Sequence, residues 1–366
     1  MIPIAEPSIT QKEIDYVHDA ISSGWVSSQG KYMDLFITAL QQQTGAKHAL
    51  PVNNGTASLI LPLLALGLTK GDEVIVPDYT FAATVNAVII AGGTPVIIDV
   101  GNRAQMTASD FSDAISERTK AVIPVHLYGE VGEIEEICTI AAEHNIFVLE
   151  DAAEVYGAFK NGKSAGTFGD CGSFSFYGNK IVTTGEGGAI TTNNTEFYEK
   201  MKMIMNHGMR PHKRYWHEVV GCNFRMTNLQ AAVGVAQLER ITDIQESRMN
   251  LFKAYASGVE NISGCTTFST VKRTESYIPA QWLFNVVLDK SNVDDVVERM
   301  HANGVDARRT FYPMHSMDIY SEYTNQKLSY ENSVHFANAM MSIPSSTELS
   351  NDQIKTVLKV LEESIG

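Results

Sequence analysis

One stretch of the chain decides the fold: AVIPVHLYGEVGEIEEICTIAAEHNIFVLED, residues 121–151. It begins and ends with a short apolar run of β-forming residues. The segment between the two runs has helical spacing on one face, at Ile134, Ile137, Cys138 and Ala141. A strand, a crossover helix and a second strand in this order form the βαβ unit of a parallel sheet. Both runs are apolar throughout rather than alternating, which is typical of strands covered on both faces.

The same pattern extends towards the N-terminus. The runs EVIVP (73–77) and PVIID (95–99) are also apolar and β-rich, and helix-length segments separate the runs from one another. Four such strands predict a doubly wound α/β domain with a mostly parallel sheet flanked by helices. Ligands of these sheets bind at the carboxyl ends of strands, so the residues just after each run are the first candidates for a site.

The pattern changes in the second half of the chain. We predict a long helix over 227–247, which Thr227 or Asn228 would cap. A strand is predicted at WLFNVVLD (282–289) and an amphipathic helix over 352–364. This mixture indicates a second, smaller C-terminal α/β domain.

The length of 366 residues suits two domains. We divide the chain into an N-terminal arm (1–15), a large domain (16–248) and a small domain (249–366). The sequence does not decide on which domain the arm packs.

Composition and charge exclude several classes of protein. The chain is 44% hydrophobic and 19% charged, which is ordinary for a globular protein and excludes disorder. Its 28 Lys and Arg residues against 42 Asp and Glu residues give a formal net charge of −14. So acidic a chain has no general attraction for phosphodiester backbones, and we expect no nucleic-acid partner. A helix N-terminus could still bind one small anion.

The sequence also carries expectations about compartment and metals. The first ten residues lack the pattern of a signal peptide, and the longest largely apolar run, 57–68, is far shorter than the ~20 residues that span a bilayer. We therefore expect a cytoplasmic protein without a membrane partner. The cysteines are far apart, without a Cys-x-x-Cys pair, and indicate neither a zinc site nor a disulfide framework: Cys138, Cys171, Cys222 and Cys265.

The first candidate segment is VNNGTAS, residues 52–58, which opens an apolar helix. Gly55 permits close approach of the backbone to a ligand, and Thr56 can cap the helix while its amide and hydroxyl face an anion. Taken alone, the segment is better described as an ordinary helix cap.

The second segment is EDAAE, residues 150–154, directly after an apolar strand. A carboxylate in this place can hold a cationic ring nitrogen, bind a metal or cap the next helix. No histidine pair stands nearby in the sequence to complete a metal site, so no metal is expected. The other two interpretations remain open. His126, which ends another strand, is expected to order that strand end.

The third segment joins GSFSFYGNK (172–180) to the glycine-rich TTGEGG (183–188). Lysine is normally a solvated surface charge. Lys180, however, lies between a strand that looks buried and a glycine cluster. A desolvated lysine has a lowered pKa and can act as a Schiff-base nucleophile.

Together these segments resemble the DegT/DnrJ/EryC1/StrS aminotransferases, a family of fold-type I enzymes that depend on pyridoxal phosphate. The resemblance runs across almost the whole chain. No single motif is specific, but the ordered set is: GWVSSQGKY (24–32), NNGTASL (53–59), GDEVIVP (71–77), HLYG (126–129), EDAAE, FSFYGNK, TTGEGG and FRMTNLQAAVG (224–234).

The resemblance implies roles for particular residues. Lys180 would hold pyridoxal 5′-phosphate as a Schiff base, and Asp151 would pair with the protonated pyridine nitrogen. The other implied cofactor contacts are the phosphate with Gly55, Thr56 and Ser175, the ring face with Phe81, and the ring oxygen with Glu154. Asn223 would reach the phosphate from a second subunit, which implies a homodimer with shared active sites. The weaker substrate candidates are Arg214, Tyr312 and His315, for which a solvated or packing role has similar odds.

The resemblance also implies a reaction. An amino group would pass from L-glutamate to C4 of a nucleotide-linked 4-keto-6-deoxyhexose. The segment around RYW (214–216), together with Glu154, favours GDP-4-keto-6-deoxymannose and hence GDP-perosamine for polysaccharide biosynthesis. A UDP- or dTDP-linked sugar is the alternative, and the nucleotide, the stereochemistry at C4 and any oligomer beyond the dimer stay open.

Three other functions are weaker. A sugar dehydratase of the same family would carry histidine in place of Lys180. A non-catalytic regulator would need a DNA-binding module, for which this acidic chain has no spare segment. A dinucleotide-dependent oxidoreductase would need Gly-x-Gly-x-x-Gly after an early strand, and the glycines at 185–188 have a different spacing.

Overall fold

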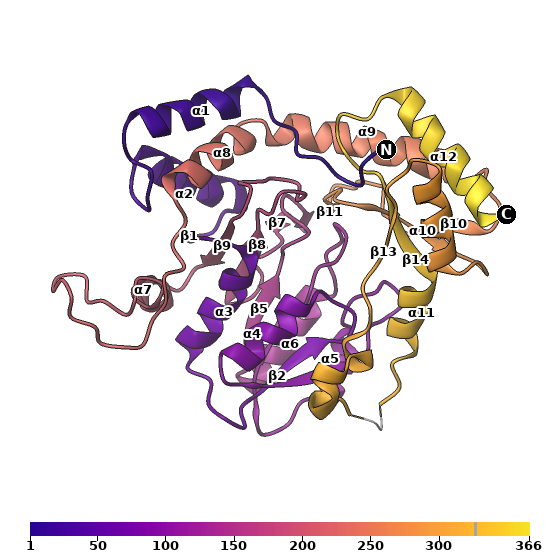
Figure 1. Ribbon diagram of the computed structural model, residues 1–366. Coiled ribbons are helices and arrows are strands. Elements are labelled where there is room, and N and C mark those ends of the chain that lie inside the picture. The colour runs from indigo at the N-terminus through magenta and orange to yellow at the C-terminus, as the bar shows by residue number, and fades with distance from the viewer. Residues whose placement is uncertain (326–327) are drawn as a thin grey trace.

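The computed structural model describes residues 1–325 and 328–366. At its centre is a seven-stranded sheet with the order β1-β9-β8-β5-β4-β2-β3 (Figure 1). Its strands are β1 (His48–Val52), β2 (Glu73–Pro77), β3 (Thr94–Ile98), β4 (Thr119–Val122), β5 (Phe147–Asp151), β8 (Cys171–Ser175) and β9 (Gly188–Thr192). β9 runs antiparallel to both of its neighbours, β1 and β8, and the other neighbouring strands in this sheet are parallel. The predicted mostly parallel α/β sheet is confirmed, and the four apolar runs are β2 to β5.

Helices cover both faces of this sheet, as the uninterrupted apolar runs require. Strand β2 shows why: Val74 and Val76 belong to one apolar cluster and Ile75 belongs to another. Side chains of α3, α4 and α7 complete the first cluster, and those of α5 and α6 complete the second. The helices are α3 (Gly55–Leu66), α4 (Ala82–Ile90), α5 (Ala108–Asp113), α6 (Ile134–His144) and α7 (Thr195–Ile204).

The predicted long helix over 227–247 is wrong as a single element. Thr227 caps α8 (Asn228–Leu238) with a capping box, but the chain breaks at the next two residues and continues as α9 (Ile241–Val259). Arg240 at the break donates to the Ser8 carbonyl at 3.2 Å and lies 3.5 Å from the Glu13 carboxylate. The break lets α8 pack on α1 (Gln11–Ser22) and α2 (Lys31–Thr44) while α9 crosses to a second sheet.

The second sheet is antiparallel and four-stranded, with the order β10-β12-β14-β13. Its apolar core is built with α9 and with two later helices. The elements are β10 (Cys265–Thr267), β12 (Phe284–Leu288), β13 (Arg308–Arg309), β14 (Met340–Ile343), α10 (Val293–Ala302) and α12 (Asn351–Ile365). The strand predicted at 282–289 and the helix predicted over 352–364 are thus confirmed as β12 and α12.

The two sheets are joined at several places. In α9, Ile244 packs in the cluster around the first sheet and Leu251 packs in that of the second. Because α9 packs in both clusters, we propose that the large and small domains meet within it, at the predicted boundary 248/249. We also propose the predicted N-terminal arm of residues 1–15. The arm begins beside the second sheet, where Ile2 forms an isolated bridge with Val305, shortly before β13 (Figure 1).

Two further pieces of chain cross between the first unit, built on the seven-stranded sheet, and the second unit, built on the four-stranded sheet. A three-stranded sheet contains β6 (Phe159–Lys160), β7 (Lys163–Ser164) and β11 (Tyr277–Ile278). The segment between β13 and β14 returns to the first sheet through the short helices η1 (Met314–Ser316) and η2 (Asp318–Tyr323) and then α11 (Glu331–Ala339). Tyr320 anchors it there by donating to Asn86 on α4 at 2.8 Å.

A long loop after α7 leaves the body of the molecule, at the left of Figure 1. All residues from 211 to 220 are exposed. Arg210 and Glu218 form an ion pair of 2.8 Å at the base of this loop. Among the described residues, no helix is long and apolar enough to cross a membrane.

Candidate active site

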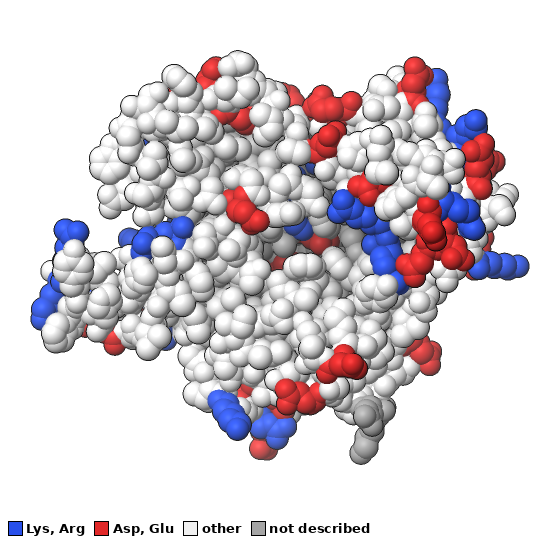
Figure 2. Space-filling model, in the orientation of Figure 1, with Lys and Arg blue, Asp and Glu red and all other residues white. Residues whose placement is uncertain are grey.

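A cavity of about 410 Å³ lies between the two sheets, beyond the carboxyl end of β5. Figure 2 shows this face hollowed, with side chains of both charges inside the hollow. The first unit contributes the residues that the sequence predicted, and the strand β13 with the segment after it contributes the opposite wall. The predicted residues that line the cavity are Gly55, Thr56, Phe81, Asp151, Glu154, Ser175 and Lys180.

One end of the cavity is the N-terminus of α3. Asn54 caps the helix by accepting from the Ala57 amide at 2.8 Å, so the expectation that Thr56 is the cap is wrong. The first amides of a helix have no intrahelical partner, and those of Gly55 and Thr56 are thus left as donors beside the cavity. A Cβ added to Gly55 would lie 2.8 Å from Cβ of Ser175. Glycine is therefore required for the serine hydroxyl to lie against the helix end, and the two together form an anion site.

Asp151 ends β5 on the floor of the cavity and is only 5% exposed. Its carboxylate accepts from the Thr84 hydroxyl at 2.8 Å and from the Ala153 amide at 3.2 Å. Burial raises the pKa of Asp151, while these two hydrogen bonds and the nearby Lys180 lower it. A buried carboxylate that lacks a close cationic partner is suited to bind a cation from a ligand.

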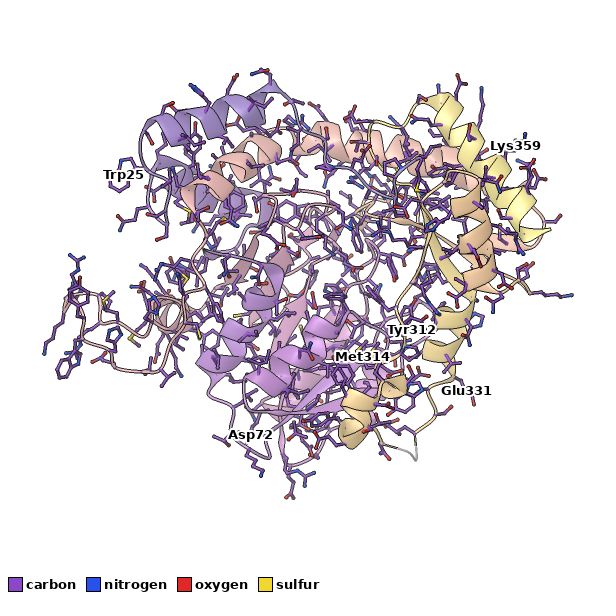
Figure 3. The ribbon with its side chains drawn as sticks, in the orientation of Figure 1. Trp25, Asp72, Tyr312, Met314, Glu331 and Lys359 are labelled. Atoms are coloured by element: carbon purple, nitrogen blue, oxygen red, sulfur yellow. The ribbon has the colours of Figure 1, made fainter. Side chains whose placement is uncertain are left out.

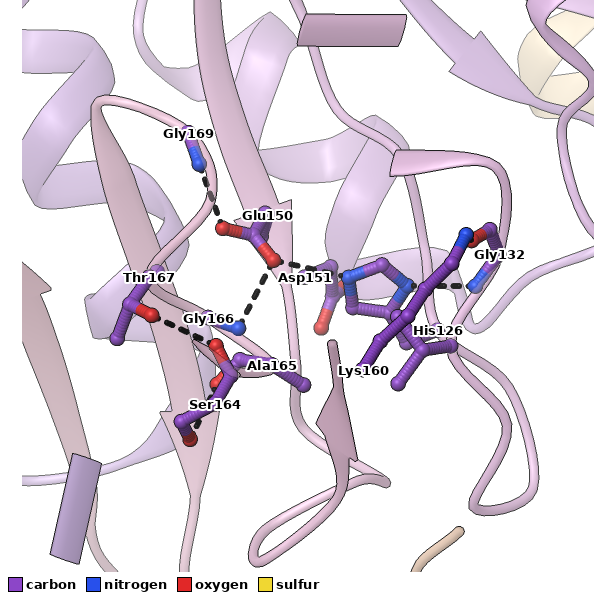
Figure 4. Close-up of polar contacts among 12 residues, drawn as sticks. His126, Gly132, Glu150, Asp151, Lys160, Ser164, Ala165, Gly166, Thr167 and Gly169 are labelled. Atoms are coloured by element: carbon purple, nitrogen blue, oxygen red, sulfur yellow. Dashed lines mark hydrogen bonds and ion pairs between the residues drawn. The ribbon is translucent and has the colours of Figure 1, made fainter. Parts of the chain in front are cut away.

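The neighbouring Glu150 faces the other side of β5 (Figure 4). It contacts Nε2 of His126 at 3.0 Å and accepts from the amides of Gly166 and Gly169 at 2.8 and 2.7 Å. The Gly132 amide donates to Nδ1 of His126 at 3.3 Å, so Nε2 is the nitrogen that donates to Glu150. This buried network joins His126 to the end of β5.

Lys180 follows β8 and its side chain is 14% exposed. Nζ lies 3.6 Å from the Glu154 carboxylate and 3.7 Å from the centre of the Trp282 ring. Burial lowers the pKa of Lys180, and the charges of Glu154 and Asp151 oppose that shift. Burial also raises the pKa of Glu154, whose other oxygen accepts from the Tyr128 amide at 3.0 Å. The lysine is therefore desolvated, as the sequence predicted for a nucleophile.

Phe81 is 61% exposed, which is unusual for an aromatic residue at the end of a buried strand. It stands at the N-cap position of α4 with its ring centre 6.1 Å from that of Phe311. An exposed ring that lines a cavity offers a flat apolar face to a ligand.

The cavity lining does not include four of the predicted residues. Arg214 and Asn223 lie exposed on the loop after α7. Tyr312 lies on the segment after β13 (Figure 3), and the centre of its ring is 3.5 Å from Cζ of Arg309. His315 is engaged elsewhere, since its Nδ1 contacts Asp78 at 2.7 Å and its ring stacks on Tyr330 at 4.3 Å.

Sequence reasoning missed several residues that line the cavity or support its side chains. Thr84 holds Asp151, and Trp282 lies against Lys180. The wall opposite the sheet carries Arg308, Arg309 and Phe311. The sequence predicts Trp282 only as the start of a strand, and no local pattern indicates that it reaches a lysine about a hundred residues earlier in the chain. Among the described residues, no group of three or more His, Cys, Asp or Glu side chains is placed to hold a metal.

Comparison with known proteins shows which enzymes this chain resembles. A model of the DegT/DnrJ/EryC1/StrS aminotransferase family matches residues 7–362. The chain is 38% identical to GDP-perosamine synthase of Vibrio cholerae over 366 residues, covering 99% of this chain and 98% of the relative.

Solved structures agree. PseC of Helicobacter pylori, an aminotransferase of pseudoaminic acid biosynthesis, superposes with a TM-score of 0.94 at 25% identity, covering 100% of this chain and 99% of the other. The putative sugar aminotransferase Spr1654 of Streptococcus pneumoniae, in its pyridoxal phosphate form, gives a TM-score of 0.93 at 25% identity, covering 100% and 98%.

Aminotransferases of this kind depend on pyridoxal phosphate, and the residues of the cavity fit that cofactor. The Gly55–Ser175 contact at the end of α3 suits a phosphate. The buried carboxylate of Asp151 suits a protonated ring nitrogen, and the desolvated Lys180 suits a carbonyl carbon.

We expect Gly55→Ala to weaken binding of pyridoxal phosphate at least about tenfold, because the new methyl group must displace Ser175 from the helix end. Equilibrium titration of the apoprotein, followed by cofactor absorbance, measures this. Gly178→Ala is the matched control, because the nearest atom to its added Cβ is 3.9 Å away. Equal affinities of the Gly55→Ala and wild-type proteins would refute the phosphate site.

Proposed function

The chain belongs to the DegT/DnrJ/EryC1/StrS aminotransferase family, and from this we propose that it transfers an amino group from L-glutamate to C4 of a nucleotide-linked 4-keto-6-deoxyhexose. We propose GDP-4-keto-6-deoxymannose as the acceptor and GDP-perosamine as the product. The 38% identity to a GDP-perosamine synthase over nearly the whole chain supports this substrate. The observation that carries the reaction is the desolvated Lys180 amine in one cavity with the buried Asp151 carboxylate.

The cofactor supplies, when bound, a ring that delocalises the electron pair left behind when a proton leaves the neighbouring carbon. Asp151 would keep the ring nitrogen protonated, since its buried carboxylate gains most from a cationic partner. A charge-assisted hydrogen bond of this kind contributes about 1.5–3 kcal/mol. Thr84 fixes the carboxylate by its 2.8 Å bond, so that one oxygen is oriented before the ligand arrives.

Lys180 would do two things. Its Nζ would hold the cofactor covalently before the reaction. After release, the same nitrogen would move a proton between the substrate carbon and the exocyclic carbon of the cofactor. Burial lowers the pKa of the amine, which increases the neutral fraction able to accept a proton near neutral pH. The Glu154 carboxylate, 3.6 Å away, stabilises the ammonium form that results.

The remaining groups position the reactants. We propose that Gly55, Thr56 and Ser175 bind the phosphate and that Phe81 covers one ring face. Because these contacts surround one small volume, they hold the reacting carbon next to Nζ of Lys180.

We propose that the protein is a homodimer with shared active sites, located in the cytoplasm. Asn223 and Arg214 lie outside the cavity of their own chain, on a loop that projects from the body. Tyr215 and Trp216 of this loop are largely exposed, which suits burial against a second copy. In this arrangement Asn223 binds the phosphate in the partner's cavity.

The substrate proposal is tested by turnover of 4-keto-6-deoxy sugars linked to GDP, UDP and dTDP. We expect kcat/KM for GDP-4-keto-6-deoxymannose to exceed that for the UDP-linked sugar at least about tenfold. Equal or faster turnover of the UDP sugar would overturn the perosamine assignment and leave the aminotransferase intact.

We expect Asp151→Asn to slow the half-reaction with L-glutamate by about a hundredfold or more, because a neutral amide cannot keep the ring nitrogen protonated. Single-turnover absorbance measurements give this rate. Asp72→Asn makes the same chemical change at a partly exposed site before β2, far from the cavity, and should leave the rate unchanged (Figure 3). A near-normal rate in folded Asp151→Asn protein would exclude the role.

The shared site is tested by mixing two inactive variants. Lys180→Ala removes the nucleophile, and Asn223→Asp places a carboxylate where the phosphate of the partner's cofactor should lie. After subunit exchange, a heterodimer contains one site with both residues intact, so activity should return. The control mixes Lys180→Ala with the double variant Lys180→Ala/Asn223→Asp, because no heterodimer of these two chains has an intact site. No recovery despite proven exchange would contradict the proposed position of Asn223.

A further inference from the structure

Trp282 reaches the catalytic lysine from the second unit of the molecule. It precedes β12, is 5% exposed and lines the same cavity as Lys180. The lysine Nζ stands 3.7 Å from the centre of the indole ring, which is within contact distance of the ring face. Burial of a tryptophan is ordinary, but an amine against its face inside a cavity is a specific arrangement.

The indole is fixed from three directions. Its Nε1 donates to the carbonyl of Asn179, the residue before the lysine, at 2.8 Å. Its ring stacks on Tyr128, with centres 6.2 Å apart and an angle of 11° between the planes. The backbone carbonyl of Trp282 accepts from Nη1 of Arg248 at 2.8 Å.

Arg248 is a buried cation that bonds backbone carbonyls rather than a carboxylate. It is 4% exposed on α9, and the same Nη1 also contacts the carbonyl of Ser345 at 3.2 Å. Burial lowers the pKa of Arg248 to about 10, so the guanidinium is still charged at neutral pH. It therefore holds the chain at Trp282 in one place relative to α9.

The two groups around the lysine amine act on its charged form in the same direction. Glu154 attracts the ammonium from 3.6 Å, and the negative face of the indole attracts it from 3.7 Å. Both attractions are stronger where water is excluded, and the lysine side chain is largely buried.

We propose that Trp282 is a positioning residue for Lys180: when the amine is not covalently bound, the indole face and the Glu154 carboxylate hold it at one place in the cavity and stabilise the ammonium that forms when it accepts a proton. The inference rests on the proposed function, because an aminotransferase releases its lysine in one half of each cycle. Held there, the amine stays beside the reacting carbon.

Other titratable and charged groups share the cavity and contribute to the charge of the amine. Asp151 favours the ammonium, as Glu154 does, and burial disfavours it. The further groups that face the amine or line its cavity are Tyr128 after β4, Tyr177 and Glu186 near the lysine itself, and Arg308 and Arg309 on β13. All of these are unchanged in the variants below, so a difference between the variants reports the indole.

Fluorescence tests the contact without any substrate. In a Trp25→Phe/Trp216→Phe protein, Trp282 is the one remaining tryptophan. Loaded with pyridoxamine 5′-phosphate, this protein has a free lysine amine, and the emission of Trp282 should change with pH as that amine titrates. Adding Lys180→Ala should abolish the change. An identical pH dependence with Lys180→Ala would overturn the proposal, whether or not any sugar is a substrate.

The energetic role is tested by the pH profile of the reverse half-reaction, in which the pyridoxamine 5′-phosphate form reacts with 2-oxoglutarate and Lys180 starts as a free amine. Removing the ring should lower the pKa of the amine, so the acidic limb of the rate profile should move to lower pH by about one unit in Trp282→Leu. Trp282→Phe keeps a weaker aromatic face and should lie between the two. A purely structural role would lower the rate at every pH and leave the midpoint in place, which would refute the inference. If Trp282→Leu fails to fold, the shift in Trp282→Phe and the fluorescence experiment decide.

Discussion

The structure depends on opposite charges held close together on the buried floor of one cavity. Lys180, Asp151 and Glu154 lie together there, and burial by itself disfavours the charged form of each. Removing one member of such a group leaves the others buried without compensation, which commonly destabilises a protein by about 3–5 kcal/mol. The fold must therefore bring all three side chains together. The parallel sheet does so because β5 and β8 are neighbours that end at the same edge.

The second unit completes this environment. The first sheet supplies the charges, but a sheet edge alone would leave them in water. Trp282 and Phe311 close the cavity from the opposite side, and Arg248 fixes the chain that carries the indole. The N-terminal arm adds a further tie, since Ile2 pairs with the second unit. The antiparallel sheet thus serves the chemistry by excluding water and by fixing where its wall stands.

Sequence patterns predicted what depends on local order. Strands β2 to β5 were evident because apolar runs of β-forming residues need no distant partner to be recognised, and Gly55, Asp151 and Lys180 followed because strand ends collect ligands. Contacts made only by tertiary packing were missed. Asn54 rather than Thr56 caps α3, and no periodicity reports which of two neighbouring polar residues will do so. The break before α9 arises from contacts of Arg240 with the N-terminal arm, which the helical pattern around it does not contain.

An acidic chain that binds an anionic cofactor raises an electrostatic question, and distance resolves it. The formal charge of −14 is spread over the whole surface, and at physiological ionic strength charges separated by more than about 8 Å are largely screened from one another. The potential inside the cavity is therefore decided by the groups that line it. Arg308 and Arg309 stand on the wall opposite Asp151, and the amides of α3 lie at one end. The anion-binding helix end is thus separate from the carboxylates on the cavity floor, which favours a phosphate at the end of α3.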